Sequence, residues 1–277
     1  MKVDMLVQST DVPKQMTFRQ AARKAVAMCV SDFAAKGVGP DSFMVSVGLA
    51  RGVTKAQVRE LSLGLLDASR EWKLKLIGGD TSEAAELMIS CVMLGFTRNY
   101  VKRAGARVGD AVVVTGAFGY PPAGLRILKG AKAASGFRRR AFASVLRPTP
   151  NLNLGLALGG YWTSSMDSSD GLARSLHILA KANAAGIELW KLPMDKGVAE
   201  FAASNGISAK KLVMEGGEEY LIVGTMRPGK VRAAAKVARR SGGELIEIGR
   251  VTEKRGVRLR TGGSVTQVPD AGWVHLR

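Results

Sequence analysis

Acidic residues are scarce in this chain of 277 residues, which has 23 Asp and Glu against 41 Lys and Arg and a formal net charge of +18 at pH 7. No acidic residue occurs between Asp110 and Asp167. So basic a composition invites a nucleic-acid partner. Aromatic residues, however, make up only 6% of the chain, and none interleave with the basic runs as base stacking requires. We therefore do not expect nucleic acid as a partner.

Cysteine and long apolar runs are scarce as well. The two cysteines, Cys29 and Cys91, have no paired spacing and no neighbouring His, so we interpret both as small buried hydrophobic residues. No apolar run approaches the roughly 20 residues that cross a bilayer. The N-terminus, interrupted by Asp4 and Gln8, lacks the apolar centre of a signal peptide. We therefore expect a cytoplasmic protein with no membrane partner.

The chain also lacks a phosphate-binding P-loop, since no G-x-x-x-x-G-K-[ST] motif occurs. It has only two histidines, His177 and His275, and we interpret both as structural. These absences leave few residue types for catalysis. The carboxylates are the best candidates.

Several of the few carboxylates lie beside glycine and hydroxyl residues. Residues 166–172 read Met-Asp-Ser-Ser-Asp-Gly-Leu, where a short apolar run meets an expected helix. One Asp or Ser at such a point caps a helix, but Asp167 and Asp170 within one turn repel each other, and a cap needs only one. A hard cation such as Mg²⁺, which takes oxygen ligands, accounts for the second carboxylate.

Similar placements recur along the chain. The recurring carboxylates are Asp4, Asp11, Asp32 after Ser31, Asp80 after Gly78 and Gly79, and Glu218 and Glu219 after Gly216 and Gly217. Phosphoryl transfer requires heavy neutralisation of charge. Without a P-loop, aspartates that hold several magnesium ions can supply it.

Hydrophobic periodicity predicts an α+β (mixed α/β) fold in two parts. In the first part we expect strands at 4–8, 42–50, 74–78 and 86–97, with helices from Thr17 to Gly37 and from Thr54 to Trp72, which give a sheet with helices on one face. The basic stretch 98–109 has no periodicity and is typical of a linker, so we expect domains at 1–100 and 101–277. In the second part we expect strands at 111–115, 186–190, 219–226, 244–250 and 256–260 and helices at 121–130, 137–146, 170–185 and 228–241.

Taken together, the motifs resemble those of the thiamine-monophosphate kinase family, within the AIR synthetase-like (PurM-like) superfamily. The matching pieces, in the family's order and with similar spacing, are residues 4–7, 31–35, 77–81, 103–106, 114–117, 166–172, 215–220, 248–250 and 272–275. They cover essentially the whole chain. The resemblance implies a PurM-like fold, with an N-terminal ATP/Mg-binding and dimerisation domain (1–100), a C-terminal domain (101–277), and a homodimer.

The resemblance also implies an activity, the ATP-dependent phosphorylation of thiamine monophosphate to thiamine diphosphate with several Mg²⁺ ions. The acceptor is itself a phosphate with a second pKa of about 6, so no catalytic base is expected. Carried over position by position, the metal ligands are Asp4, Asp32, Asp80, Asp167 and Asp170, the ATP contacts are Gly79, Asp80, Arg103 and Ser169, and the substrate contacts are Asp11, Glu218 and Trp273. A guanidinium suits phosphate oxygens, and a carboxylate with an aromatic face suits the cationic thiazolium.

The chain departs from the family pattern at a few positions. Asp11 stands where bacterial members often have a His, Glu219 stands where Asp is usual, and Lys2 and Val3 precede Asp4 in place of hydroxyl residues. Family members also begin with a helix and a strand that carry a Gly-Asp-Asp motif, and this chain begins after it. We expect the functional protein to carry such residues upstream. The alternative is a divergent member with fewer metals.

Two other functions remain open from the sequence. One is another superfamily enzyme, such as a selenophosphate synthetase, which needs a reactive Cys near its N-terminus, or an AIR synthetase, which residues 218–220 and 273–275 disfavour. The other is a catalytically impaired, basic nucleotide-binding homologue. Nucleotide binding measured with and without magnesium separates these functions.

Overall fold

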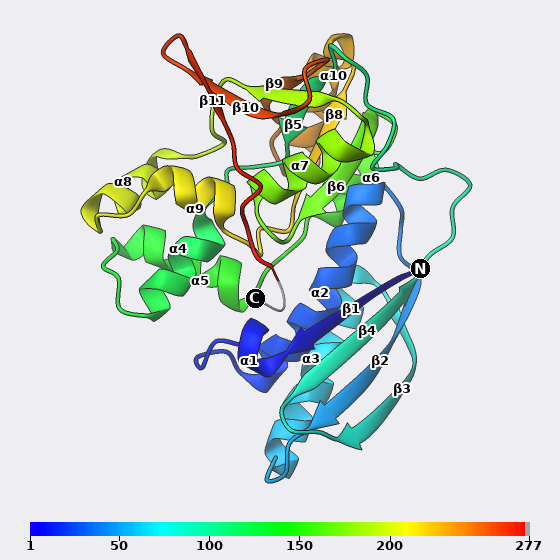
Figure 1. Cartoon of the computed structure of the whole chain (residues 1–277). Helices are drawn as coiled ribbons and strands as arrows, with labels where there is room; N and C mark the ends of the chain where they lie inside the picture. Colours follow the sequence, from blue (N-terminus) through cyan, green and yellow to red (C-terminus); the bar gives the residue numbers. More distant parts are fainter. Residues whose placement is uncertain (275–277) are drawn as a thin grey trace.

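Two sheets organise the chain, and the structure, a computed structural model, describes residues 1–274 (Figure 1). The first sheet has four strands in the order β1-β4-β2-β3. Their bounds are β1 Lys2–Val7, β2 Ser42–Leu49, β3 Lys75–Glu83 and β4 Met88–Leu94. Strands β2 and β3 are parallel, and the other two pairs are antiparallel. This order puts β1 and β3 at opposite edges of the sheet.

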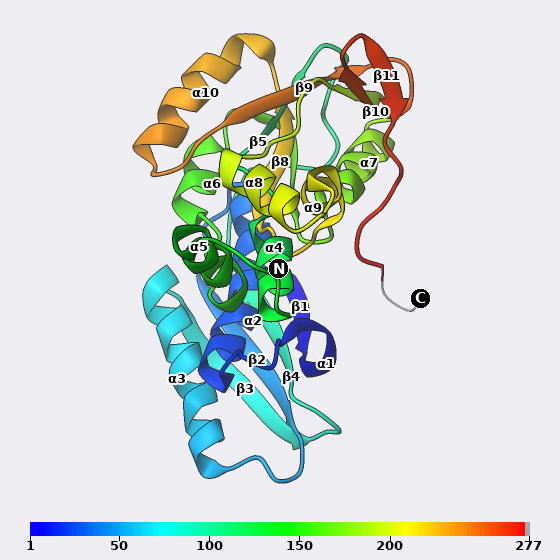
Figure 2. The same cartoon turned by 90° about the vertical axis from the view of Figure 1, so that its left-hand side faces the viewer.

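Two long helices cover one face of this sheet, α2 (Phe18–Lys36) and α3 (Lys55–Trp72), and Figure 2 shows α3 alongside the strands. Both begin where the sequence predicts, after Thr17 and Thr54, and each start is a capping box; such caps stabilise a helix by about 1 kcal/mol. Gly37 ends α2 with φ +64°, a left-handed conformation that glycine adopts without strain. A short helix, α1 (Gln8–Asp11), links β1 to α2.

The second sheet has seven strands in the order β11-β10-β7-β9-β5-β8-β6. Their bounds are β5 Ala111–Val114, β6 Trp162–Ser168, β7 Gly186–Leu189, β8 Leu221–Met226, β9 Ile246–Thr252, β10 Gly256–Thr261 and β11 Ser264–Gln267. The helices of this half are α4 Tyr120–Leu128, α5 Ser135–Leu146, α6 Leu152–Leu158, α7 Leu172–Ala182, α8 Lys196–Ser204, α9 Ala209–Glu215 and α10 Pro228–Arg240. Only the β7–β10 pair is parallel among the pairings of this sheet within residues 1–274.

Helix α2 joins the two halves, because it packs on β1 and β4 of the first sheet and on α6, β6 and β8 of the second. Its carboxyl end approaches α6 closely, since a Cβ at Gly155 would lie 2.2 Å from the carbonyl oxygen of Ala34. Only glycine permits this approach. Ala34 and Ala35 then share an apolar cluster with Leu158 and Ile222. Residues on α2 therefore reach both sheets.

The structure confirms the predicted fold class, and every predicted strand and helix occurs with bounds shifted by a few residues. The hydrophobic periodicity did not predict six short elements, α1, α6, β6, α8, α9 and β11. Strand β6 reads Trp-Thr-Ser-Ser-Met-Asp-Ser and is almost wholly buried, so its polar residues gave no alternating pattern. Residues 98–109 form no helix or strand, as a linker predicts. The division into two domains stays a prediction.

Both cysteines are free and fully buried, as predicted. Of the two histidines, His177 contacts the carbonyl oxygen of Val268 through its Nε2 atom at 2.8 Å, which agrees with a structural role. His275 lies outside the described residues. No helix within residues 1–274 is long and apolar enough to span a membrane.

Candidate active site

Asp167 lies at the buried end of β6, just before α7. Helix α7 has Gly171 as its N-cap and no side-chain capping bond, so neither Asp167 nor Asp170 serves as the helix cap. The carboxylate of Asp167 is 6% exposed and accepts a hydrogen bond of 2.9 Å from the Ser31 hydroxyl on α2. Burial and then the nearby charge of Asp32 raise the pKa of Asp167 well above its usual range, while the Ser31 bond opposes the rise. A cation beside such a buried carboxylate stabilises its ionised form.

Asp4 and Asp32 share one cation supplied by the chain. The Nζ atom of Lys2 lies 2.6 Å from Asp32 Oδ2 and 3.1 Å from Asp4 Oδ1. Burial raises the pKa of Asp4, and Lys2 counteracts this. The charges of both Asp4 and Asp32 raise the pKa of Asp167. These three residues, here called the three-aspartate group, thus come together from β1, α2 and β6.

The loop at residues 215–220, which carries Glu218, is fastened to the turn that follows β6. The Glu218 N–H donates to the Ser169 carbonyl at 2.6 Å, and the Tyr220 N–H donates to the Ser168 carbonyl at 3.2 Å. Glu218 and Tyr220 have φ values of +63° and +49°. These values lie in the left-handed region, which residues other than glycine occupy at a cost in free energy. A Cβ at Gly217 would lie 2.7 Å from the Ser169 oxygen, so glycine is required there.

The C-terminal segment reaches the same turn. The Trp273 N–H donates to the Asp170 carbonyl at 2.9 Å. A Cβ at Gly272, whose φ is +153°, would lie 2.1 Å from that carbonyl oxygen. The side chain of Trp273 is half-exposed. The predicted substrate residues Glu218 and Trp273 therefore border the predicted ATP and metal residues Ser169 and Asp170.

Two lysines of α2 lie beside predicted site residues, although the sequence pattern did not predict them. Lys24 is fully buried; its Nζ atom donates to the Asp11 carbonyl at 2.7 Å and forms an ion pair with Glu218. Lys36 donates to the Ser165 carbonyl at 2.5 Å. Burial and the charge of Arg103 lower the pKa of Lys36 to about 8. The sequence does contain a signal for Lys24, because this lysine interrupts an alanine-rich stretch.

Arg103 lies within electrostatic reach of this group, as its effect on Lys36 shows. Its side chain is exposed, and its carbonyl accepts a 2.9 Å hydrogen bond from Asn183. Asp11 lies at the end of α1 and accepts a 2.7 Å bond from the Val7 N–H.

Gly79 and Asp80 lie apart from the three-aspartate group, on the exposed edge strand β3. Asp80 pairs in register with Ser46 of β2. It lines an apolar hollow between β3 and α3, together with Gly79 and Leu65. The sheet order therefore separates Asp80 from Asp4 by the full width of the sheet.

The donor set fits a hard cation. The five predicted ligands offer only carboxylate oxygens, which Mg²⁺ prefers, and two of them, Asp4 and Asp32, already pair with one cation, the ammonium of Lys2. Within residues 1–274, however, no group of three or more His, Cys, Asp or Glu side chains is arranged so that it could hold a metal ion. The five-residue ligand set stays a prediction.

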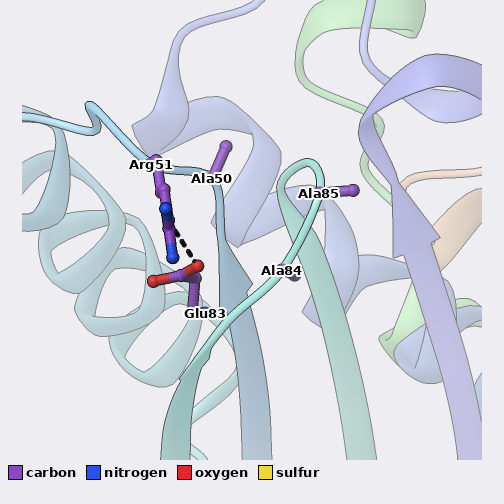
Figure 3. A pocket seen from close by; sticks show the side chains of 5 residues that line it. All are labelled: Ala50, Arg51, Glu83, Ala84 and Ala85. Atoms are coloured by element: carbon purple, nitrogen blue, oxygen red, sulfur yellow. Dashed lines mark hydrogen bonds and ion pairs between the residues drawn. The ribbon is translucent and has the colours of Figure 1, made fainter.

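A further hollow lies at the distal end of the first sheet, lined by Ala50, Arg51, Glu83, Ala84 and Ala85 (Figure 3). Arg51 Nε lies 2.6 Å from Glu83 Oε1 there. None of the predicted site residues lines it, so it does not belong to the site.

Cys29 is unsuited to the nucleophilic role that a selenophosphate synthetase requires. Its thiol donates to the Cys91 carbonyl at 3.4 Å and is fully buried. Hydrogen bonding to Cys91 and burial raise the thiol pKa far above its usual range. The thiolate, which is the reactive form, is therefore suppressed.

Comparisons with known proteins bear on the family and the fold. Residues 1–97 match the family described as AIR synthase related protein, N-terminal domain. The chain is 38% identical to a thiamine-monophosphate kinase from Nitrosopumilus maritimus (strain SCM1), over 100% of this chain and 88% of that protein. Its structure is similar to thiamine monophosphate kinase from Aquifex aeolicus, with TM-score 0.86, 27% identity, and coverage of 96% of this chain and 88% of that chain. It is also similar to AaThiL complexed with AMPPCP and TMP, with TM-score 0.88, 28% identity, and coverage of 99% and 86%.

The similarity extends over both sheets and essentially the full length of the chain, and it confirms the PurM-like mixed α/β fold expected from the motifs. The 38% identity over the whole of this chain establishes kinship. This chain belongs to the thiamine-monophosphate kinase family of phosphotransferases, within the AIR synthase-related, PurM-like superfamily.

Proposed function

We propose that this chain transfers the γ-phosphoryl group of ATP to thiamine monophosphate in the cytoplasm, giving thiamine diphosphate, with Mg²⁺ held by aspartates. Kinship with thiamine-monophosphate kinases supports this, and so does the relative that is complexed with AMPPCP and TMP. The observation that carries the proposal is the 2.6 Å hydrogen bond between the Glu218 N–H and the Ser169 carbonyl. It joins the expected substrate contact to the expected ATP contact, as transfer between two bound phosphates requires.

Mg²⁺ would be held by the predicted ligands at two places: Asp4, Asp32 and Asp167, with Asp170 on the turn after β6, at one, and Asp80 at the opposite edge of the first sheet at the other. When bound, such ions neutralise and orient the phosphate oxygens. Arg103 and Ser169 bind ATP on the side of the three-aspartate group, and Gly79 binds it beside Asp80. Lys36 adds a second positive charge near Arg103, as their electrostatic interaction indicates. Positive charges aimed at the transferred group stabilise the charge that develops on it.

On the substrate side, Glu218 and Trp273 hold the cationic thiazolium by charge and by the aromatic face. Asp11 lies on the same side, because its carbonyl and Glu218 share the ammonium of Lys24. The acceptor oxygen belongs to a phosphate whose second pKa is about 6. It is ionised at neutral pH, so the residues orient it and need not remove a proton.

The test is a measurement of thiamine diphosphate formation by the purified chain with ATP, Mg²⁺ and thiamine monophosphate. We expect product with Mg²⁺ and none with chelator. Unphosphorylated thiamine serves as the control acceptor and should give no product. Nucleotide binding without turnover would contradict the proposal and favour the impaired binding homologue.

A further inference from the structure

Lys24 lies in the middle of α2 with its side chain fully buried. The residues around it on the helix, Ala21, Ala22, Ala25 and Val26, are buried and apolar. A buried ammonium is costly unless it is paired and hydrogen-bonded. A lysine in such a place therefore has specific partners to hold.

The partners come from both halves of the chain. The ammonium donates to the Asp11 carbonyl, 13 residues away in α1, at 2.7 Å. It also donates to Glu218 Oε1, 194 residues away, in the loop between α9 and β8. These are two of the three residues expected to contact the phosphorylated thiazolium substrate. One cation thus connects both to the same point of α2.

Glu218 needs such support. Its φ of +63° is unfavourable for a residue with a side chain. The hydrogen bond from its N–H to the Ser169 carbonyl fixes its backbone, and the ion pair with Lys24 fixes its side chain. Oε1 accepts a hydrogen bond from Lys24, and Oε2 has no hydrogen-bond partner within the described part of the chain. Oε2 is therefore the oxygen that can face a cationic ligand.

We propose that Lys24 is a positioning residue for the substrate, which acts by holding the Glu218 carboxylate in the orientation that binds thiamine monophosphate, while the Asp11 carbonyl anchors the ammonium. The inference rests on the proposed function. Lys24 itself does not contact the reacting atoms. Its loss frees the Glu218 side chain and leaves a part-buried carboxylate without its cation, so substrate binding weakens while ATP binding does not.

The neighbouring Arg23 offers a matched control. It is also buried on α2, at 3% exposure, and it is also paired, with Glu71 at 2.7 Å and with the Pro148 carbonyl at 2.7 Å. It stacks over Trp72 at 4.7 Å. None of these partners is an expected substrate or ATP residue. Truncating Arg23 therefore removes a buried cation of the fold without touching the site.

The experiment compares Lys24→Met, Arg23→Met, Glu218→Gln and the double variant Lys24→Met/Glu218→Gln. Binding of thiamine monophosphate is measured by calorimetry, and KM for each substrate and kcat by product formation. We expect Lys24→Met to raise the Kd and KM for thiamine monophosphate at least tenfold, with KM for ATP within twofold. Arg23→Met should lower Tm and leave both KM values within twofold.

The double variant separates positioning from a general loss of structure. If Lys24 acts through Glu218, the double variant binds thiamine monophosphate no more than twofold more weakly than Glu218→Gln alone. The proposal is overturned if the effects of the two substitutions on the Kd for thiamine monophosphate multiply in the double variant. An unchanged KM for thiamine monophosphate in Lys24→Met overturns it as well. Should Lys24→Met fail to fold, Lys24→Gln takes its place, since it is neutral and can still donate to Asp11. If the wild-type chain neither binds nor phosphorylates thiamine monophosphate, the proposed function fails and this inference falls with it.

Discussion

The ammonium of Lys2 lies 2.6 Å from Asp32 and 3.1 Å from Asp4, so a side chain of β1 bridges carboxylates of β1 and α2. The side chains of Asp32 and Asp4 are 16% and 23% exposed. The chain thus supplies a cation of its own beside the residues expected to bind Mg²⁺.

Replacing Lys2 should make the stability of the protein depend on Mg²⁺. In chelator, Lys2→Met leaves Asp4 and Asp32 to repel each other, and we expect a loss of about 1 kcal/mol because the group is partly exposed. Mg²⁺ should then raise the Tm of the variant more than that of the wild type. Lys75→Met, which removes an exposed ion pair with Asp41, is the control. Equal responses of Lys2→Met and wild type to Mg²⁺ would contradict the prediction.

Asp80→Asn tests the metal assignment on the other edge of the sheet. Because Asp80 is exposed on β3, the fold should persist, with Tm within a few degrees of wild type. Activity should fall by about 100-fold or more, roughly the 3 kcal/mol that one key electrostatic group supplies. Glu83→Gln on the same strand serves as the control and should keep its activity. Near-wild-type turnover in Asp80→Asn removes Asp80 from the site.

We expect a homodimer formed through the open face of the first sheet. Val3 and Met5 of β1 and Met44 of β2 point away from the helices and are 52%, 50% and 37% exposed. The register places both Val3 and Met44 opposite Val92 of β4, so they form one row. Exposed apolar rows and edges of this kind favour self-association.

Light scattering should therefore give twice the chain mass at micromolar concentration. The variant Val3→Asp/Met5→Glu should shift the population to monomer, because it places charges in the apolar row. Val265→Glu, on exposed β11, should leave the dimer intact. A wild-type monomer at that concentration would be evidence against the prediction.

Glu219 should make the protein less stable as pH rises. Its carboxyl is buried and accepts a 2.6 Å hydrogen bond from the Gly119 N–H, and burial raises its pKa well above the usual 4.5. The folded state therefore keeps a proton that the unfolded state loses above pH 4.5. This contribution to stability is complete below pH 4.5 and is lost as pH rises toward the folded-state pKa.

Unfolding free energies from denaturant titrations between pH 4.5 and 7.5 test this. Wild type should lose up to about 1.4 kcal/mol per pH unit from this group, and Glu219→Gln should remove that slope. Glu86→Gln, whose partner Ser9 is exposed, should keep it. An unchanged slope in Glu219→Gln would assign the pH dependence to other groups.

Local signals of the chain are accurate where they act over a few residues. The helix starts at Thr17 and Thr54 and the stop at Gly37 occur as the sequence predicts, because a cap joins atoms three residues apart. The short polar strand β6 was missed, since burial of Ser164 and Ser165 depends on neighbouring elements and not on their own polarity. Lys24 was missed for the same reason, because a lysine is usually exposed.

The sequence by itself determined the family, the order of the motifs and the mixed α/β class, because each motif is a short run whose residue types are restricted by backbone conformation and chemistry. Only the tertiary structure decided which motifs meet. It joins Ser31 to Asp167 across 136 residues and Lys24 to Glu218 across 194, and it places Asp80 on the far edge of the sheet from Asp4. Such distances depend on strand order and on the packing of α2 between two sheets. These are properties of the whole folded chain, and no local pattern carries them.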